Sequence, residues 1–281
     1  MKRYVIVLTV LCCAVCLPQA YTETPEEIGT RLMKRNDDRP VFERVKNKVV
    51  INIYNTAGEL KFKKSLIMGA YTENMGTPNQ CEKYISYFMA PPDDMGNSYL
   101  ALNYKNKPDE KYLYLKGIRK VKKVTGADKK LSFFGSDFAN GDVGKPDFLE
   151  WKYRLIGEDK IEFKGKIFDC NMIECLPRDE GIKRDTGYSK RIFFLEKKTG
   201  LTLKIDYYDE AGIKCKQLRL LSFTTAPNVR GEKVFYETGI EMKNVKTGSR
   251  TELLFIEPKF EAEANIRTDI FTTEYLTRRW W

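Results

Sequence analysis

The sequence of 281 residues contains no histidine. Because histidine is the usual general base near neutral pH, its absence excludes a Ser-His-Asp triad and a Cys-His dyad. It also excludes a histidine-based zinc site. Most hydrolase mechanisms are therefore ruled out before any motif is considered.

Long apolar runs are also scarce, and the longest of them covers residues 5–17. Two basic residues at 2–3 precede this run and a short cleavage site at 18–20 follows it, which is the layout of a secretory signal peptide. The run is too short to span a bilayer. We therefore expect a signal peptide at 1–20 and an exported, soluble protein whose net charge falls from +10 to +8.

Three cysteines inside this segment allow a second interpretation, in which one of them carries a lipid. Leu11 precedes Cys12 and Val15 precedes Cys16, where lipidation normally requires a small residue. Cys13 also lies in the segment. We favour the cleaved signal peptide and keep lipid anchoring as the alternative.

Four cysteines remain after residue 20, namely Cys81, Cys170, Cys175 and Cys215. An exported chain permits disulfides, but a chain of this length can also build a core without them. Disulfide bonds and free buried thiols both stay open. The spacing lacks the close CxxC pairs of four-cysteine zinc sites, so we expect no metal.

One helix and then a series of strands are predicted along the chain. Thr24, Pro25 and Glu27 form a capping-box pattern that begins a helix running to about Lys34. Alternating runs then predict strands, and turn residues separate them. The predicted strands in the first half cover residues 49–54, 60–69, 84–89, 99–104 and 111–115.

The second half alternates more regularly. Leu149, Trp151, Tyr153 and Leu155 are predicted to share one strand face. The same pattern predicts one shared face for a second set, which comprises Leu201, Leu203, Ile205 and Tyr207. Turn sequences at 197–200, 209–212 and 246–248 indicate hairpins between antiparallel neighbours.

The composition, 42% hydrophobic and 12% aromatic, excludes a disordered chain. No linker interrupts the strands, so we expect a single domain at 21–281. A dozen amphipathic antiparallel strands form a curved sheet, a sandwich or a barrel. A barrel of this size either encloses a cavity for an apolar ligand or is filled by helices and side chains, and composition does not decide between these.

Several short motifs in a fixed order resemble the LolA-like family of outer-membrane lipoprotein-sorting proteins. The signature combines Tyr112–Leu115, the basic run Arg119–Val124 and the block Phe133–Phe138. Further matching pieces are 94–100, 207–212, 242–251 and 270–276, so the resemblance covers about residues 45 to 276. Lys116 and Ala139-Asn140 depart from the family pattern.

The resemblance implies a mainly β fold: a curved antiparallel sheet forming an incomplete β-barrel, with helices covering its concave face. It implies a periplasmic carrier or chaperone that holds acyl chains of lipoproteins or lipids in a hydrophobic cavity and delivers them towards the outer membrane. Such a carrier is not an enzyme and needs no cofactor. Alternatives are an accessory subunit of an envelope lipid exporter, with an inner-membrane transporter as its partner, and a lipid hydrolase.

Two groups of candidate residues follow. The candidate cavity lining, which strand spacing explains equally well as ordinary core, comprises Leu113, Leu115, Phe133, Phe134, Trp151, Tyr153, Phe193, Leu195, Ile205 and Tyr207. The candidate docking residues for an anionic membrane surface or an acidic partner, which could also form a solvated strand face, are Arg119, Lys120, Lys122 and Lys123. Export makes a nucleic-acid partner unsuitable.

Three other features have structural explanations at this stage. Gly135-Ser136-Asp137 lacks the second glycine of a nucleophile elbow and is predicted to form a turn. No spacing selects a catalytic pair among Glu174, Asp206 and Glu237. The terminal 277–281 segment, with two arginines and two tryptophans, fits a membrane interface or a tail folded back on the sheet.

Overall fold

The computed structural model describes residues 22–145 and 147–281. The expected signal peptide and its three cysteines lie outside the described residues. Two helices, α1 (Pro25–Asp37) and α2 (Glu180–Thr186), accompany thirteen strands. The strands are β1 (Arg44–Tyr54), β2 (Leu60–Glu73), β3 (Cys81–Ala90), β4 (Ser98–Tyr104), β5 (Glu110–Leu115), β6 (Lys120–Lys123), β7 (Trp151–Phe163), β8 (Lys166–Pro177), β9 (Tyr188–Glu196), β10 (Thr202–Asp209), β11 (Lys214–Pro227), β12 (Lys233–Asn244) and β13 (Arg250–Phe260).

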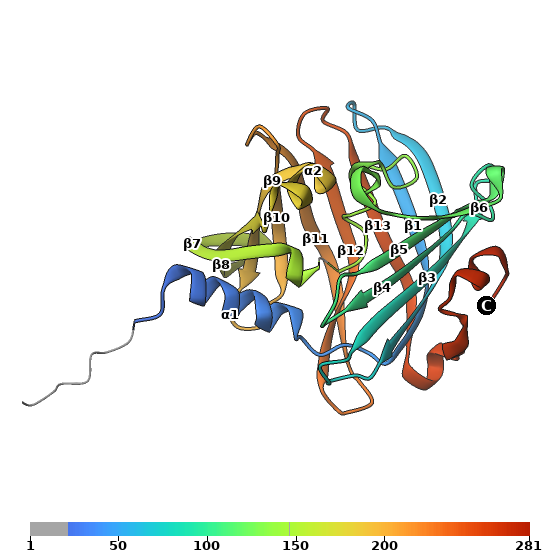
Figure 1. The fold of residues 1–281 in the computed structure, drawn as a ribbon, viewed down its shortest axis with the longest axis horizontal. Coiled ribbons are helices and arrows are strands. Elements are labelled where there is room, and N and C mark those ends of the chain that lie inside the picture. Colours follow the sequence, from blue (N-terminus) through green and yellow to red (C-terminus); the bar gives the residue numbers. More distant parts are fainter. Residues whose placement is uncertain (1–21, 146) are drawn as a thin grey trace, which may run out of the picture.

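All thirteen strands form one antiparallel sheet in the order β6-β5-β4-β3-β2-β1-β13-β12-β11-β10-β9-β8-β7. The sheet is strongly curved and stays open, with β6 and β7 as its edge strands (Figure 1). The predicted hairpins at 197–200, 209–212 and 246–248 join successive neighbours. The predicted fold class, mainly β with an incomplete antiparallel barrel, is confirmed.

Helix α1 begins at the predicted capping box and ends three residues later than expected, at Asp37. The Glu27 backbone N–H donates to Thr24 Oγ1 at 3.2 Å, and the Thr24 N–H donates to Glu27 Oε2 at 2.8 Å. The helix packs on β7 through Gly29, where a Cβ would lie 2.7 Å from the Arg154 backbone. Glycine is therefore required for this close approach.

A main cluster of buried side chains collects from the inner face of nearly every strand. Met33 of α1 belongs to it, and Ile182 of α2 packs against it, so both helices cover this face. Adjacent residues of β9 alternate between clusters, with Phe193 in the main cluster and Phe194 in a second one. This second cluster, the hairpin cluster, comprises Cys170, Ile192, Phe194, Leu201, Leu203 and Leu220.

The prediction of a single face for the second set of alternating residues is wrong. The pairing of β9 with β10 shifts register between Thr202 and Lys204, so the alternation is reversed at that point. Leu203 therefore joins the hairpin cluster, whereas Ile205 and Tyr207 lie in the main cluster.

The C-terminal segment folds back on the outer face of β3 and β4. Ile270 and Leu276, both buried, pack there against Ile85 and other residues of an outer cluster. Trp280 packs against the same cluster, and the ring of Trp281 lies 4.6 Å from that of Tyr87. Of the two interpretations of this tail, the structure supports the one in which it packs on the sheet.

The four described cysteines are free, which settles the disulfide question in favour of free thiols; Cys81, Cys170 and Cys175 are buried and Cys215 is half-buried. Burial raises the pKa of Cys81 and Cys170 to about 11 and that of Cys175 to about 12, so these thiols are unreactive near neutral pH. Within the described ranges, no group of acidic or cysteine side chains could hold a metal ion, and no helix is long and apolar enough to cross a bilayer.

Candidate functional site

The ten candidate cavity residues lie on the inner side of the sheet or on the loop that covers it. Eight of them are buried members of the main cluster, contributed by β5, β7, β9, β10 and the connection before β7. Phe134 packs against the cluster while half-buried. Leu115, at the end of β5, is half-buried and belongs to no cluster. The sequence pattern therefore located the apolar interior of the curved sheet.

The connection between β6 and β7, residues 124–150, crosses the concave side and fills part of it (Figure 1). Phe133 meets Tyr99 edge to face at 5.3 Å between ring centroids. The ring centroids of Phe134 and Phe88 lie 4.4 Å apart, and the backbone of Phe134 has a positive φ of 48°. Phe133 and Phe134 of this crossing segment thus fill part of the concave side with their own side chains.

Asp137 ties the crossing segment to β13. Its carboxylate accepts hydrogen bonds from Ser249 Oγ at 2.6 Å and Thr251 Oγ1 at 2.7 Å. The buried Ser136 hydroxyl donates to the Phe133 carbonyl at 2.7 Å. The Gly-Ser-Asp block is thus a structural turn, as predicted, and its aspartate anchors the turn to the sheet.

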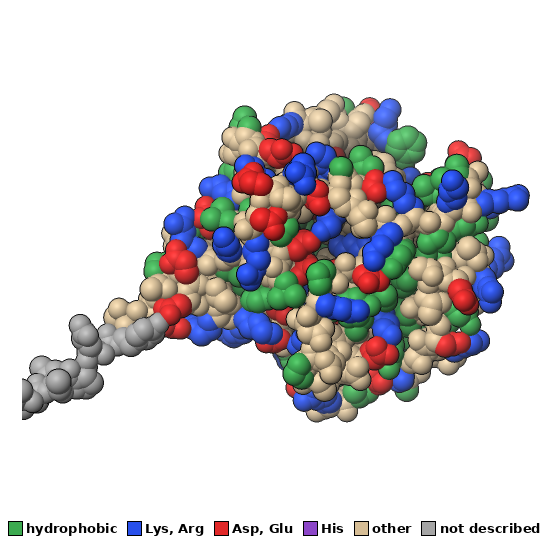
Figure 2. Space-filling model, viewed as in Figure 1, with side chains coloured by type: hydrophobic (Ala, Val, Ile, Leu, Met, Phe, Trp, Pro, Cys, Tyr) green, Lys and Arg blue, Asp and Glu red, His purple; other side chains and the backbone are tan. Residues whose placement is uncertain are grey.

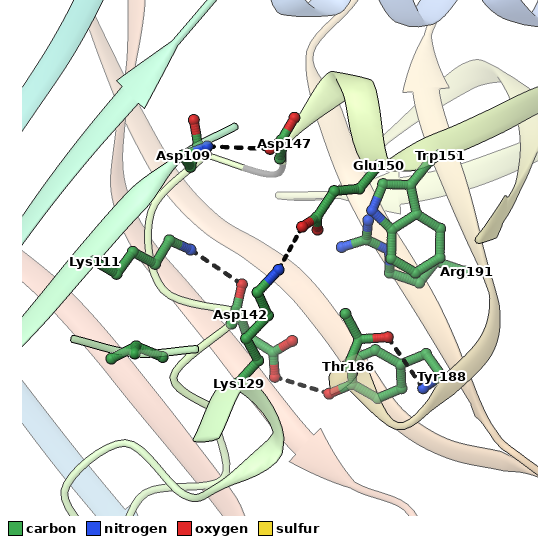
Figure 3. A pocket seen from close by; sticks show the side chains of 12 residues that line it. Asp109, Lys111, Lys129, Asp142, Asp147, Glu150, Trp151, Thr186, Tyr188 and Arg191 are labelled. Carbon is green, nitrogen blue, oxygen red and sulfur yellow. Dashed lines mark hydrogen bonds and ion pairs between the residues drawn. The ribbon is translucent and has the colours of Figure 1, made fainter. Parts of the chain in front are cut away.

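A small polar cavity of about 40 Å³ lies beside this segment (Figure 3). Charged side chains from both halves of the sheet line it, together with Val124, Trp151 and Tyr188 of the main cluster. The charged residues are Asp109, Lys111, Lys129, Asp142, Asp147, Glu150 and Arg191. Of the candidate cavity residues, Trp151 alone lines this space.

Two carboxyl groups of this cavity have a raised pKa. Burial, and then the neighbouring charge of Asp147, raise the pKa of Asp109 to about 7, although Asn103 Nδ2 and the Tyr104 N–H donate to its carboxylate. Burial also raises the pKa of Asp147. The opposite shift occurs at Lys111, whose pKa is lowered by burial. Buried charge is therefore poorly solvated here.

Arg191 stands out among the cavity residues. It is 6% exposed, its guanidinium lies 3.6 Å from the centre of the Trp151 ring, and its Nε has no hydrogen-bond partner. Sequence reasoning missed this residue. The available signal was its position two residues before Phe193 on β9, where alternation assigns it to the buried face.

A second hollow of about 560 Å³ is an open groove at the other end of the sheet. The end of α1, the β2–β3 connection and the β11–β12 connection line it. Lys34 and Lys105 both form ion pairs with Asp38 there, at 2.7 and 2.8 Å. Because these charges already pair with one another, the groove offers no free recognition group among them.

The four candidate docking residues are exposed on and beside the edge strand β6. Two of them have acidic neighbours, because Lys122 pairs with Asp128 at 2.6 Å and Lys123 lies 3.6 Å from Glu110. Figure 2 shows basic side chains around β6 next to hydrophobic ones. Charges on an edge strand also prevent pairing with other sheets, so their position fits both explanations.

Exposed apolar side chains gather at the same end of the sheet as the start of β6. Because successive strands are antiparallel, the connections 55–59, 91–97 and 116–119 all lie at this end, which we call the 55–59 end. Its exposed apolar residues include Leu60, Phe62, Ile118 and Val121.

The three carboxylates considered for catalysis are occupied in separate ion pairs. Glu174 pairs with Arg154 at 2.5 Å and Lys190 at 3.2 Å. Asp206 pairs with Lys214 at 2.8 Å, and Glu237 pairs with Arg39. These carboxylates serve as structural partners of basic side chains.

Several solved structures share this fold. A domain from Vibrio parahaemolyticus, described as an outer-membrane lipoprotein-sorting protein, is 22% identical, with a TM-score of 0.74. A DUF1329 family protein from Desulfovibrio piger is 24% identical, with a TM-score of 0.75, and a LolA superfamily protein from Nitrosomonas europaea is 18% identical, with a TM-score of 0.59. Each match covers 90% of this chain and 100% of the other.

No protein with a curated function matches the sequence. A family model described as an uncharacterized protein family matches residues 80–278, which is most of the chain and includes the crossing segment and the polar cavity. The chain therefore belongs to this family of uncharacterised proteins, and it shares the fold of the LolA superfamily protein from Nitrosomonas europaea.

Proposed function

We propose that the protein is a periplasmic carrier that binds acyl chains of lipoproteins or lipids and delivers them towards the outer membrane. The observation that carries this proposal is the one-sided construction of the fold. An open sheet presents a continuous apolar inner face. The crossing segment and the helices α1 and α2 cover that face, in place of a second sheet. Such a cover can move without breaking a ladder of strand hydrogen bonds.

The energetics suit binding and release without a chemical step. Each methylene kept from water is worth about 0.8 kcal/mol, so a long acyl chain gains enough to replace side-chain contacts of similar area. Of the two hollows described above, the polar cavity is far smaller than such a chain, and the groove is open and charged. Loading therefore requires the crossing segment to leave the inner face, with Phe133 and Phe134 exchanging their contacts for those of the ligand.

The test is extraction of a fluorescent acyl lipid from vesicles by the purified protein. Wild-type protein is expected to take up lipid, and Phe193→Asp, which places a charge on the inner face, is expected to abolish uptake. Phe235→Asp is the matched control, because Phe235 packs on the hairpin cluster instead. Circular dichroism checks that both variants fold, and lipid uptake by wild-type protein that equals that of buffer would contradict the proposal.

A second function is favoured by the packed interior. An accessory subunit of an envelope lipid exporter would need a docking face and no acyl cavity of its own. The exposed apolar and basic residues of the 55–59 end suit such a face. Co-purification with a membrane transporter, combined with failure of lipid extraction by the isolated protein, would favour this function over the carrier.

A further inference from the structure

The cavity beside the crossing segment contains a buried cation without an anionic partner. Arg191 is 94% buried, and among the described residues its guanidinium makes ring contacts with Trp151 and Phe193 and no ion pair. Arginine does not lose its proton in proteins, so it stays charged at any accessible pH. An unpaired buried charge is costly, and a bound anion would remove that cost.

Two of the acidic residues that line the cavity, Glu150 and Asp142, already have partners. Glu150 pairs with Lys129, and Asp142 accepts from the Tyr188 hydroxyl at 2.9 Å and lies 3.3 Å from Lys216 Nζ. The carboxylates of Glu150 and Asp142 are thus each paired with a lysine, and neither forms an ion pair with Arg191.

Lys111 is a second cation that lines this cavity and, among the described residues, has no ion-pair partner. Its Nζ donates to the backbone carbonyls of Val143 at 2.8 Å and Gly141 at 3.3 Å, and no carboxylate of the described residues lies within ion-pair distance. Figure 3 shows Lys111 and Arg191 on opposite sides of the cavity. An oxyanion between them would meet a cation from each half of the sheet.

The remaining acids, Asp109 and Asp147, adjoin each other at one edge of this space, where the Asp109 N–H donates to Asp147 Oδ2 at 3.2 Å. Both have a raised pKa, so they tolerate protonation when another anion enters. This leaves Arg191 and Lys111 as the groups that determine which ligand the cavity accepts.

The apolar walls of the cavity connect it with the interior. Val124, Trp151 and Tyr188 line the cavity and belong to the main cluster. A volume of about 40 Å³ admits a carboxylate or a similarly small oxyanion but no acyl chain. We propose that this cavity binds the oxyanion end of the acyl ligand, a carboxylate or a phosphate, with Arg191 and Lys111 as its cationic partners. The inference rests on the proposed carrier function and names the class of its ligand.

The test is isothermal titration of the full protein with four probes: decanoate, decyl phosphate, 1-decanol and inorganic phosphate. Decanoate or decyl phosphate is expected to bind at least tenfold more tightly than decanol, and comparison of the two identifies the preferred headgroup. Arg191→Gln is expected to remove this preference. Arg219→Gln, an exposed arginine on β11, is the matched control and should retain the wild-type preference.

Equal binding of decanol and the charged amphiphiles to wild-type protein would overturn the inference and leave the carrier function standing. A preference that survives in both Arg191→Gln and Lys111→Met would also overturn it. If Arg191→Gln does not fold, the wild-type comparison and Lys111→Met still decide. Failure of every amphiphile to bind would overturn the carrier function together with this inference, even if inorganic phosphate binds.

Discussion

Asp109 carries its carboxyl group in a place where a negative charge is poorly solvated. In an unfolded chain the pKa of an aspartate is about 3.9, whereas burial and the charge of Asp147 raise that of folded Asp109 to about 7. Lys111 opposes this shift only in part. Between about pH 4 and pH 7 the folded protein therefore binds a proton that the unfolded chain has released.

From this difference we predict that Asp109 lowers stability as pH rises through that interval, with the full cost present above pH 7. Asp109→Asn removes the ionisation, so its stability relative to wild type should improve by about 4 kcal/mol between pH 4 and pH 8. Urea unfolding at both pH values measures this change. The exposed Asp93→Asn is the control, and an unchanged pH dependence in Asp109→Asn would show that the carboxyl ionises normally.

The polar cavity shows at the scale of single residues why composition was a limited guide. The absence of histidine excludes the histidine-based catalytic arrangements, and the strand pattern then favoured apolar side chains as candidates. Arg191 and Lys111 come from β9 and β5, which lie in opposite halves of the sheet. Their meeting depends on the curvature that brings those halves together, which no local pattern contains.

At the scale of elements, the crossing segment is the part of the structure on which the proposed function depends. It covers apolar side chains and contributes no strand to the sheet between β6 and β7. Asp137 holds it to β13 through Ser249 and Thr251. A cover held at a few polar contacts can open locally at lower cost than the sheet itself.

We therefore predict that Asp137→Ala loosens this segment. The change removes the acceptor of two hydroxyl groups, one of them on the fully buried Thr251, and should lower the free energy of unfolding by about 1–3 kcal/mol. Uptake of a fluorescent acyl lipid should become several-fold faster. Stopped-flow fluorescence measures the rate, and thermal unfolding measures the stability.

Asp128→Ala provides the control, because Asp128 lies in the same segment and pairs at the surface with exposed Lys122. It should change neither the rate nor the stability appreciably. Uptake at the wild-type rate in Asp137→Ala, despite a measured loss of stability, would mean that the segment does not limit access.

At the scale of the whole molecule, the excess of basic over acidic residues gives the protein a net positive charge. Arg119, Lys120, Lys122 and Lys123 lie beside exposed apolar residues of the 55–59 end. Basic residues near a membrane contribute about 1 kcal/mol each when the lipids are anionic, and salt screens this attraction. We propose that this end contacts an anionic membrane during loading or delivery.

Replacing these four residues by glutamine is predicted to weaken binding to vesicles containing phosphatidylglycerol by at least tenfold at low salt. Binding of wild-type protein should also fall as salt increases, which co-sedimentation measures. The control replaces Lys160, Lys164, Lys166 and Lys233, exposed residues at the opposite end of the sheet. Equal losses of vesicle binding in both variants would show that the effect depends on net charge alone. Binding that does not change with salt concentration would exclude electrostatic docking.

The sequence by itself determined the features that depend on near neighbours along the chain. The capping box at Thr24, the alternating strands and the hairpin turns were all predictable, because each is stabilised by contacts within a few residues. The tertiary structure decided the rest. The crossing segment against the inner face and the unpaired Arg191 depend on residues from distant strands, which the curvature of the open sheet brings together. The register shift between β9 and β10 depends on which face of the sheet each residue packs against.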